Sequence, residues 1–282
     1  MNRIFIRLFF AFLISGTVFA QKLQKIPVEF TDFATAKKSY GTKISVLPSD
    51  SSVKITKNSI EIAPSTEGVE YTISGYFNGQ IVNKTKNTVL RLNNAYLENT
   101  SGKPVIFGEA KTEILTVRDT KNYIVSQGLG DPKSKTAAIL CKKNLELGGT
   151  GTLYVAGRVY HAVKADDVKI KGDGELYFQG TKNGSCINCD NFLVEKDKNF
   201  KAYLINSKNA VKADYTILIQ SGNFFLYDCD RVFKTDTNAD DPNSPHSITL
   251  SGGTFYISEK ELIYETEKNA YKAEGAVINY AK

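Results

Sequence analysis

The sequence has only two histidines, His161 and His246, among its 282 residues. It contains no Ser/His/Asp order with a nucleophile elbow, no paired zinc-ligand spacing and no phosphate loop of the Gly-x-x-x-x-Gly-Lys type. Sustained helical periodicity is also missing, which argues against a βαβ fold. No run of about 18 apolar residues follows the N-terminal segment, so no membrane span is predicted there. These absences leave an all-β chain without a recognisable catalytic constellation.

The first 20 residues have the three parts of a secretory signal peptide. Arg3 and Arg7 make a short basic region, residues 8–14 are apolar, and Val18-Phe19-Ala20 supplies the small residues of a signal-peptidase site. We therefore expect residues 1–20 to be removed and the protein to be exported to the periplasm, the cell surface or the medium. Because both arginines are lost, the formal net charge falls from +6 to +4, which by itself selects no partner.

From Ala138 onward the sequence repeats with a register of 24 residues. Four-residue blocks of mostly small or apolar residues recur at 138–141, 162–165, 186–189 and 210–213. Such a period indicates a solenoid whose turns stack on one another. Alternation within the blocks predicts an inward apolar column of Ile139, Val163, Ile187, Val211 and Phe233. Beside it we expect an inward column of smaller residues, namely Cys141, Ala165, Cys189, Ala213 and Thr235.

A second strand, a glycine turn and a third strand complete each repeat, as in residues 145–147, 148–151 and 153–155. Glycine supplies the positive φ that a tight solenoid corner needs. Three strands per 24 residues predict an all-β fold, a right-handed parallel β-helix over residues 71–282. Residues 21–70 fit the repeat poorly and contain Pro27, Pro48 and Pro64 as breakers. They are predicted to form an irregular N-terminal cap that shields the open end of the core.

Four cysteines in an exported chain raise the question of disulfides. Cys141 and Cys189 occupy equivalent repeat positions with Ala165 between them. Two rungs separate them by roughly 9.6 Å, which is beyond disulfide reach. We therefore expect buried thiols, with a Cys186–Cys229 disulfide as the alternative.

Several short segments carry a family resemblance. They are YTISG at 71–75, GQI at 79–81, TVLRLNNA at 88–95, NYIV at 122–125, LELGG at 145–149 and AVKAD at 210–214. From about residue 65 to 257 the chain resembles the bacterial secreted carbohydrate-binding domain proteins of parallel β-helix fold. These are similar to pectate-binding β-helices and more distantly to polysaccharide lyases. The resemblance implies binding of an acidic plant or microbial polysaccharide, with calcium ions as structural or bridging ligands.

The sequence departs from the family pattern where calcium would be held. Repeats of that family tend to read Asp-Gly-Ile before the small-residue column. Here the matching triplets begin with His161, Ser185 and Asn209, so the acidic residue is missing from all three. Calcium at those corners is therefore not expected.

An aromatic column is the first candidate for a binding surface. Equivalent outward places on five successive turns are occupied by Tyr154, Tyr177, Tyr203, Phe225 and Tyr256. Exposed rings in a row would offer apolar faces to sugars, and the tyrosine hydroxyls would hydrogen-bond sugar oxygens. The alternative is structural: the stacked rings stabilise the sheet or lie under the capping chain.

Two charged columns are the other candidates. The basic column consists of Lys164, Lys212 and Lys234, interrupted by Asn188. Ammonium groups about two turns apart are suited to the carboxylates of a uronic-acid polymer. The acidic column, two residues further along, consists of Asp166, Asp190, Asp214 and Asp236. Like charges at one-turn spacing repel, so the aspartates must be neutralised by Ca²⁺ or by the lysines, unless each caps backbone N–H groups at its corner.

A polar insertion at residues 236–246 interrupts the register. It has oxygen ligands at alternate positions, namely Asp236, Asn238 and Asp240. The glycine and the distal glutamate of an EF-hand loop are missing. A calcium site and a solvated acidic loop are both compatible with this pattern.

Taken together, these patterns predict an exported β-helix that binds an acidic carbohydrate polymer without cleaving it, assisted by calcium. The aromatic column would stack on sugars, the lysines would meet carboxylates and the aspartates would hold the calcium. The enzymatic alternative is a calcium-dependent polysaccharide lyase, with Lys164, Lys212, Arg158 or Arg231 as the base. A structural surface protein or adhesin is the third hypothesis. We expect neither a nucleic-acid partner nor a membrane span.

Overall fold

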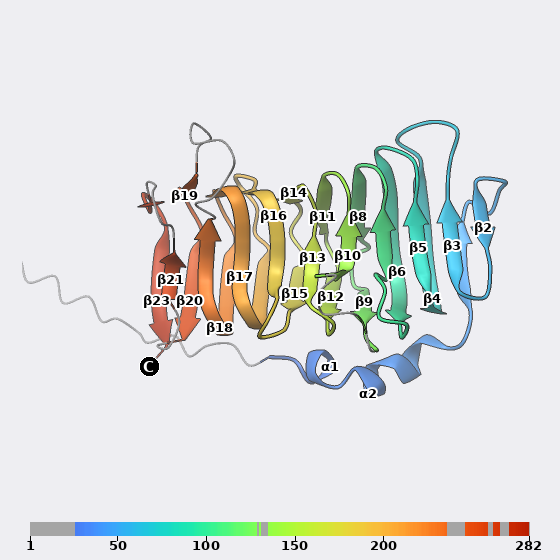
Figure 1. The fold of residues 1–282 in the computed structure, drawn as a ribbon, viewed down its shortest axis with the longest axis horizontal. Helices are drawn as coiled ribbons and strands as arrows, with labels where there is room; N and C mark the ends of the chain where they lie inside the picture. Colours follow the sequence, from blue (N-terminus) through green and yellow to red (C-terminus); the bar gives the residue numbers. More distant parts are fainter. Residues whose placement is uncertain are drawn as a thin grey trace, which may run out of the picture.

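The structure is a computed structural model that describes residues 26–128, 130, 135–235, 246–258, 262–265 and 271–281. These residues form an elongated β-solenoid of about eight turns, whose strands follow one another along the horizontal axis of Figure 1. The parallel β-helix predicted from the sequence is confirmed. Within the described ranges, no helix is long and apolar enough to cross a membrane.

Three parallel sheets run along the solenoid. The first face is built by β3 (Ser59–Ile62), β5 (Gln80–Asn83), β7 (Ile106–Gly108), β10 (Ala137–Cys141), β13 (His161–Lys164), the start of β16 (Ser185–Val194), the middle of β17 (Lys201–Ile219), the end of β18 (Asn223–Thr235) and β21 (Leu262–Glu265). Each of these strands pairs in register with the next, so equivalent side chains lie one rung, roughly 4.8 Å, apart.

The other two faces are continuous in the same way. The second is built by the first halves of β4 (Glu70–Asn78) and β6 (Thr88–Asn99), then β8 (Thr112–Thr116), β11 (Leu145–Gly149), β14 (Asp167–Ile170), the ends of β16 and β17, β19 (Ser247–Leu250) and β22 (Tyr271–Lys272). The third is built by the second halves of β4 and β6, then β9 (Lys121–Ser126), β12 (Thr152–Gly157), β15 (Glu175–Gln179), the starts of β17 and β18, β20 (Thr254–Ser258) and β23 (Val277–Ala281).

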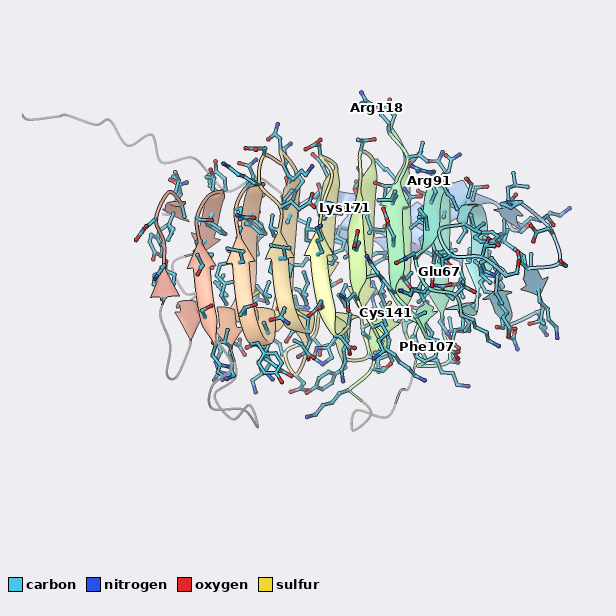
Figure 2. The ribbon with its side chains drawn as sticks, turned by 90° about the horizontal axis from the view of Figure 1, so that it is seen from above. Glu67, Arg91, Phe107, Arg118, Cys141 and Lys171 are labelled. Carbon is cyan, nitrogen blue, oxygen red and sulfur yellow. The ribbon has the colours of Figure 1, made fainter. Side chains whose placement is uncertain are left out.

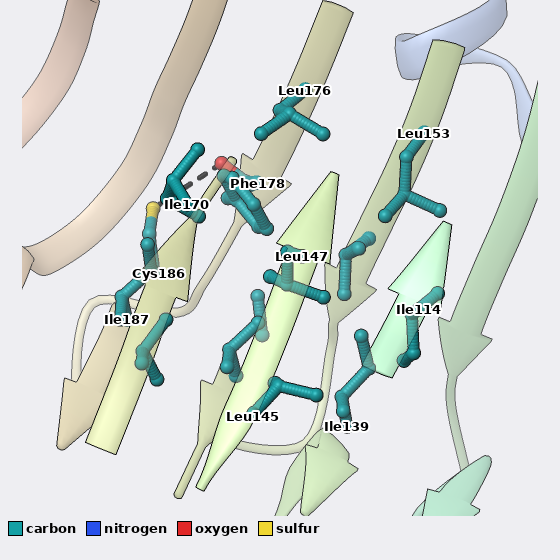
Figure 3. Close-up of a cluster of buried hydrophobic side chains, with 14 of the residues drawn as sticks. Ile114, Ile139, Leu145, Leu147, Leu153, Ile170, Leu176, Phe178, Cys186 and Ile187 are labelled. Atoms are coloured by element: carbon teal, nitrogen blue, oxygen red, sulfur yellow. Dashed lines mark hydrogen bonds between the residues drawn. The ribbon is translucent and has the colours of Figure 1, made fainter. Parts of the chain in front are cut away.

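The hydrophobic core fills the space between the three faces, as Figure 3 shows for its central rungs. The predicted inward columns are confirmed: Val163, Ile187 and Val211 are fully buried and pair rung to rung. The glycine corners are confirmed as well. Gly149 has a φ of 101°, and a Cβ there would lie 2.3 Å from the backbone N and O of Thr116. A side chain at that corner is therefore excluded both by conformation and by space.

All four cysteines lie in the described part of the chain and all are buried thiols, as expected. Burial raises the pKa of the Cys141 thiol to about 12, so it stays protonated and unreactive. Cys186 donates to the carbonyl oxygen of Phe178 at 3.2 Å (Figure 3). The alternative Cys186–Cys229 disulfide is not formed; the Ser207 hydroxyl lies 3.4 Å from the Cys186 sulfur and 3.2 Å from the Cys229 sulfur.

The N-terminal region combines an antiparallel end with a helical segment. Strand β1 (Ile44–Leu47) pairs antiparallel with β4, and β2 (Val53–Ile55) pairs antiparallel with β3. The helices α1 (Val28–Thr31), α2 (Phe33–Lys37) and η1 (Lys38–Tyr40) precede β1. The sequence led us to expect that residues 21–70 cover the open end of the core. The helices within this range do not lie there. Instead they run along the side of the solenoid, next to the third face (Figure 1).

Buried Glu98 attaches this helical segment to the solenoid. Its side chain is only 2 % exposed and accepts hydrogen bonds from the Lys37 ammonium at 2.5 Å, from the Tyr76 hydroxyl and from the Gln127 amide at 3.1 Å. One carboxylate thus links α2 to strands β4 and β6 and to the end of β9.

Replacing Glu98 by Ala is expected to lower the free energy of unfolding by about 1–3 kcal/mol, because the Tyr76 hydroxyl and the Gln127 amide lose their acceptor. Denaturant titration measures the loss, and limited proteolysis shows whether residues 26–40 become accessible. Glu98→Gln keeps one acceptor oxygen and should lose less. Equal losses in the two variants would contradict the importance of these hydrogen bonds.

Candidate functional site

A groove of about 720 Å³ runs along the first face. Its central column consists of outward side chains from successive strands that pair in register, namely Leu140, Lys164, Asn188, Lys212 and Lys234. All five line the groove. The structure therefore brings together Lys164, Lys212 and Lys234, the three lysines that the sequence placed in one column.

Further cations line the same groove. Seven lysine and arginine side chains face it against three aspartates, so its charge is positive. Sequence reasoning missed Lys135, Lys142 and Lys208, and it listed Arg231 only as a possible base. The register contained the signal for Arg231, since it pairs with Asn209, which pairs with Ser185 on the preceding rung. Lys135 carries no such signal because it precedes Ala138, where the 24-residue register begins.

His161 sits at the start of β13 in this groove, with only 5 % of its surface exposed. Its Nδ1 atom accepts a hydrogen bond from the Ser185 backbone N–H at 2.9 Å. Burial, together with the charges of Lys164, Lys212 and Lys135, lowers the pKa of His161 to about 3. The imidazole is therefore neutral at physiological pH, and the positive charge of the groove comes from lysine and arginine.

Asp166, Asp190 and Asp214 also line the groove. Burial and the neighbouring carboxylates of Asp214, Asp166 and Asp167 raise the pKa of Asp190, which shows the expected repulsion. Two members of the column also have lysine partners: Lys143 lies 3.6 Å from Asp166, and Lys212 lies 3.1 Å from Asp214.

The calcium site predicted at this column is not supported. In the part of the chain that the structure describes, no group of three His, Cys, Asp or Glu side chains is close enough to hold a metal ion. Asp166, Asp190 and Asp214 are spread along successive rungs rather than converging on one point, and lysines neutralise part of their charge. The other predicted ligands, Asp236, Asn238 and Asp240, lie outside the described residues.

The aromatic column exists as predicted, but it is not an open surface. Tyr154, Tyr177 and Tyr203 stack at centroid distances of 4.6 and 4.3 Å, and Phe225 and Tyr256 continue the stack at 4.6 and 4.8 Å. The first four are at least 93 % buried and Tyr256 is half-buried. The expectation of five exposed rings for sugar stacking is therefore wrong.

The helical segment explains much of this burial. The Phe30 ring lies 5.7 Å from Tyr154 and 5.5 Å from Tyr177, and Phe33 lies 6.1 Å from Tyr123. The stack also extends towards the N-terminus through Tyr123 and Tyr96, which the column predicted from the sequence did not include. The structural interpretation of the column, as stacked rings under the capping chain, matches these contacts.

Arg158 belongs to this covered side as well. Its guanidinium lies 4.6 Å from the centroid of the Phe33 ring, under the helical segment. It is not among the residues that line the groove. The structure therefore separates Arg158 from Lys164, Lys212 and Arg231, with which it was grouped as a potential base.

The fold and the groove define this protein as a parallel β-solenoid with a cationic groove along one face. The chain belongs to the carbohydrate-binding domain-containing protein family, whose model matches residues 49–202. This confirms the family predicted from the sequence, though not its pectate-binding type. Among solved structures it is similar to a polysaccharide lyase-like protein from C. thermocellum, a gadolinium derivative. The two share 17 % identity over 83 % of this chain and 91 % of the other, with a TM-score of 0.50. No curated protein matches the sequence.

Proposed function

We propose that this protein binds an acidic carbohydrate polymer in the groove of the first face without cleaving it. Membership of a carbohydrate-binding family supports the carbohydrate. The observation that carries the acidic specificity is the in-register column of Lys164, Lys212 and Lys234, in a groove whose cations outnumber its carboxylates. A ladder of ammonium groups with a fixed rung spacing is suited to a chain with regularly repeated carboxylates.

The direction of the groove supports a polymer rather than a single sugar. The column crosses five strands, from β10 to β18, along the solenoid axis. An extended ligand lying along this axis would contact every rung that it crosses. Binding would then be the sum of many modest contacts, which explains why the groove needs no deep pocket.

Exchanging Lys164 and Lys212 together for alanine is expected to weaken binding to polygalacturonate or alginate about tenfold, since two half-buried ion pairs of roughly 0.5–1 kcal/mol each are lost. Affinity gel electrophoresis measures the loss, and the salt dependence of binding should become shallower. Lys169→Ala is the matched control, because Lys169 is a half-buried lysine on the second face, paired with Glu195 at 2.6 Å. Failure of the wild type to bind any acidic polysaccharide would refute the proposal.

Calcium assistance is tested by the same gels with added Ca²⁺ or with a chelator. The described residues offer no cluster for a resident ion, so a calcium requirement would have to come from Asp236, Asn238 and Asp240 or from ions shared with the polymer carboxylates. We propose the shared ion, with Asp166, Asp190 and Asp214 as its partners on the protein. Loss of a calcium effect in Asp190→Asn would support this arrangement, and an unchanged effect would contradict it.

The lyase alternative is decided by the product. Cleavage by β-elimination creates an unsaturated sugar that absorbs in the ultraviolet. Incubation of pectate or alginate with the protein and calcium is expected to leave this absorbance unchanged. A steady rise that Lys212→Ala abolishes would establish the enzyme instead.

A further inference from the structure

The outward column that contains the groove lysines continues beyond them towards the N-terminus with apolar residues. In the N-terminal direction, Lys164 is followed rung by rung by Leu140, Phe107 and Val82 at the same outward position. These three side chains are apolar, and each is half-buried rather than covered. One straight column of the first face therefore changes from cationic to apolar at β10.

The apolar part is directly joined to the groove. Leu140 lines the groove and pairs with Phe107 on the preceding rung. Lys142, which also lines the groove, places its ammonium 5.3 Å from the centroid of the Phe107 ring. Figure 2 shows Phe107 on the side of the molecule opposite to Arg118. An aromatic ring, a leucine and a cation thus meet at the N-terminal end of the groove.

We infer that Phe107, with Leu140 beside it, is an apolar platform on which a sugar ring of the bound polymer stacks. This inference rests on the proposed function and adds to it a specific subsite. The C–H face of a pyranose is apolar and packs on an aromatic ring. The Lys142 ammonium, which lies over the Phe107 ring, is on a flexible side chain and would move aside to meet the sugar carboxylate. The four buried rings of the predicted column, Tyr154, Tyr177, Tyr203 and Phe225, cannot offer such a face, whereas Phe107 is partly exposed beside the groove.

The platform also assigns different roles to the two parts of the column. The lysines recognise charge, so their contribution falls as salt screens it. The Phe107 contribution comes from burial of apolar surface and is nearly independent of salt. A polymer that carries carboxylates on a carbohydrate backbone satisfies both parts at once.

The absence of tryptophan from this sequence allows a direct test. In Phe107→Trp the new side chain is the only tryptophan, so its emission reports on this site alone. Acidic oligosaccharides are expected to shift or quench this emission with the same saturation curve that affinity gels give. Leu218→Trp is the matched control, since Leu218 is a half-buried outward residue of the second face, and its emission should not change.

Phe107→Leu keeps an apolar side chain of similar bulk and removes the ring, so the fold should be preserved. We expect binding to weaken roughly threefold to tenfold at both low and high salt, and Phe107→Tyr should bind like the wild type. If the wild type binds acidic polysaccharide but Phe107→Leu binds equally well and Phe107→Trp emission stays constant, the platform is refuted and the lysine groove stands. If the wild type itself does not bind, the proposed function fails.

Discussion

Replacing Tyr177 by Ala is expected to lower the free energy of unfolding by about 3–5 kcal/mol, as is typical for a buried aromatic side chain. Tyr177 is only 1 % exposed and lies in the middle of the aromatic stack. Its ring contacts Tyr154 at 4.6 Å, Tyr203 at 4.3 Å and Phe30 at 5.5 Å. Truncation would leave a cavity between the third face and α1, and two stacked neighbours would lose one partner each.

Denaturant titration followed by circular dichroism measures this loss. Tyr177→Phe is the control because it keeps the ring and removes only the hydroxyl, which donates to Glu175 at 3.1 Å. It should cost about 1 kcal/mol. Under native conditions, the folded fraction of Tyr177→Ala should still bind acidic polysaccharide with wild-type affinity. Loss of binding with unchanged stability would show instead that the aromatic stack contacts the ligand.

His161→Asn is expected to reduce the sensitivity of the fold to acid. The folded-state pKa of His161 is lowered to about 3, mainly by burial and further by Lys164, Lys212 and Lys135, whereas the unfolded chain has a value near 6.5. Below pH 6.5 the imidazole therefore becomes protonated in the unfolded state but stays neutral in the folded state. The associated stability is complete above pH 6.5 and is lost as the pH falls towards 3.

Between pH 7 and pH 4 this single group should cost the wild type about 3 kcal/mol of stability. The asparagine side chain of the variant does not titrate, and its amide oxygen is placed to accept the Ser185 N–H that the imidazole Nδ1 accepts in the wild type. Denaturant titrations at the two pH values give the loss of stability for each protein. The effect of the carboxylates is the same in both, so it cancels when the loss of the variant is subtracted from that of the wild type. Equal acid losses in both proteins would mean that His161 titrates normally.

The neutral imidazole also bears on function. Because His161 carries no charge in the groove at neutral pH, binding of an acidic polymer should be constant between about pH 6 and pH 8 at fixed salt. A steep loss of binding above pH 6 would assign the recognition of carboxylates to a protonated histidine.

The sequence predicted the fold and the neighbours within each column for one physical reason. In a parallel solenoid each rung repeats the backbone of the previous one, so residues at equivalent positions must stack. This rule placed Lys164 and Lys212 in one column, put Tyr154, Tyr177 and Tyr203 in contact, and separated Cys141 from Cys189. Lys135, Tyr123 and Tyr96 precede Ala138, where the 24-residue register begins, so the rule was not applied to them and these neighbours were missed.

The sequence by itself determined which side chains stack in one column and which columns point outward. Only the tertiary structure decided which outward column is open to solvent. The tyrosine column and the lysine column have equally regular patterns, but Phe30 and Phe33, which are distant from Tyr154 in the sequence, pack on the first and leave the second uncovered. Covering depends on contacts between distant segments rather than on local periodicity. The open face is consequently the one with lysines and Phe107, and the stack of aromatic rings supports the fold.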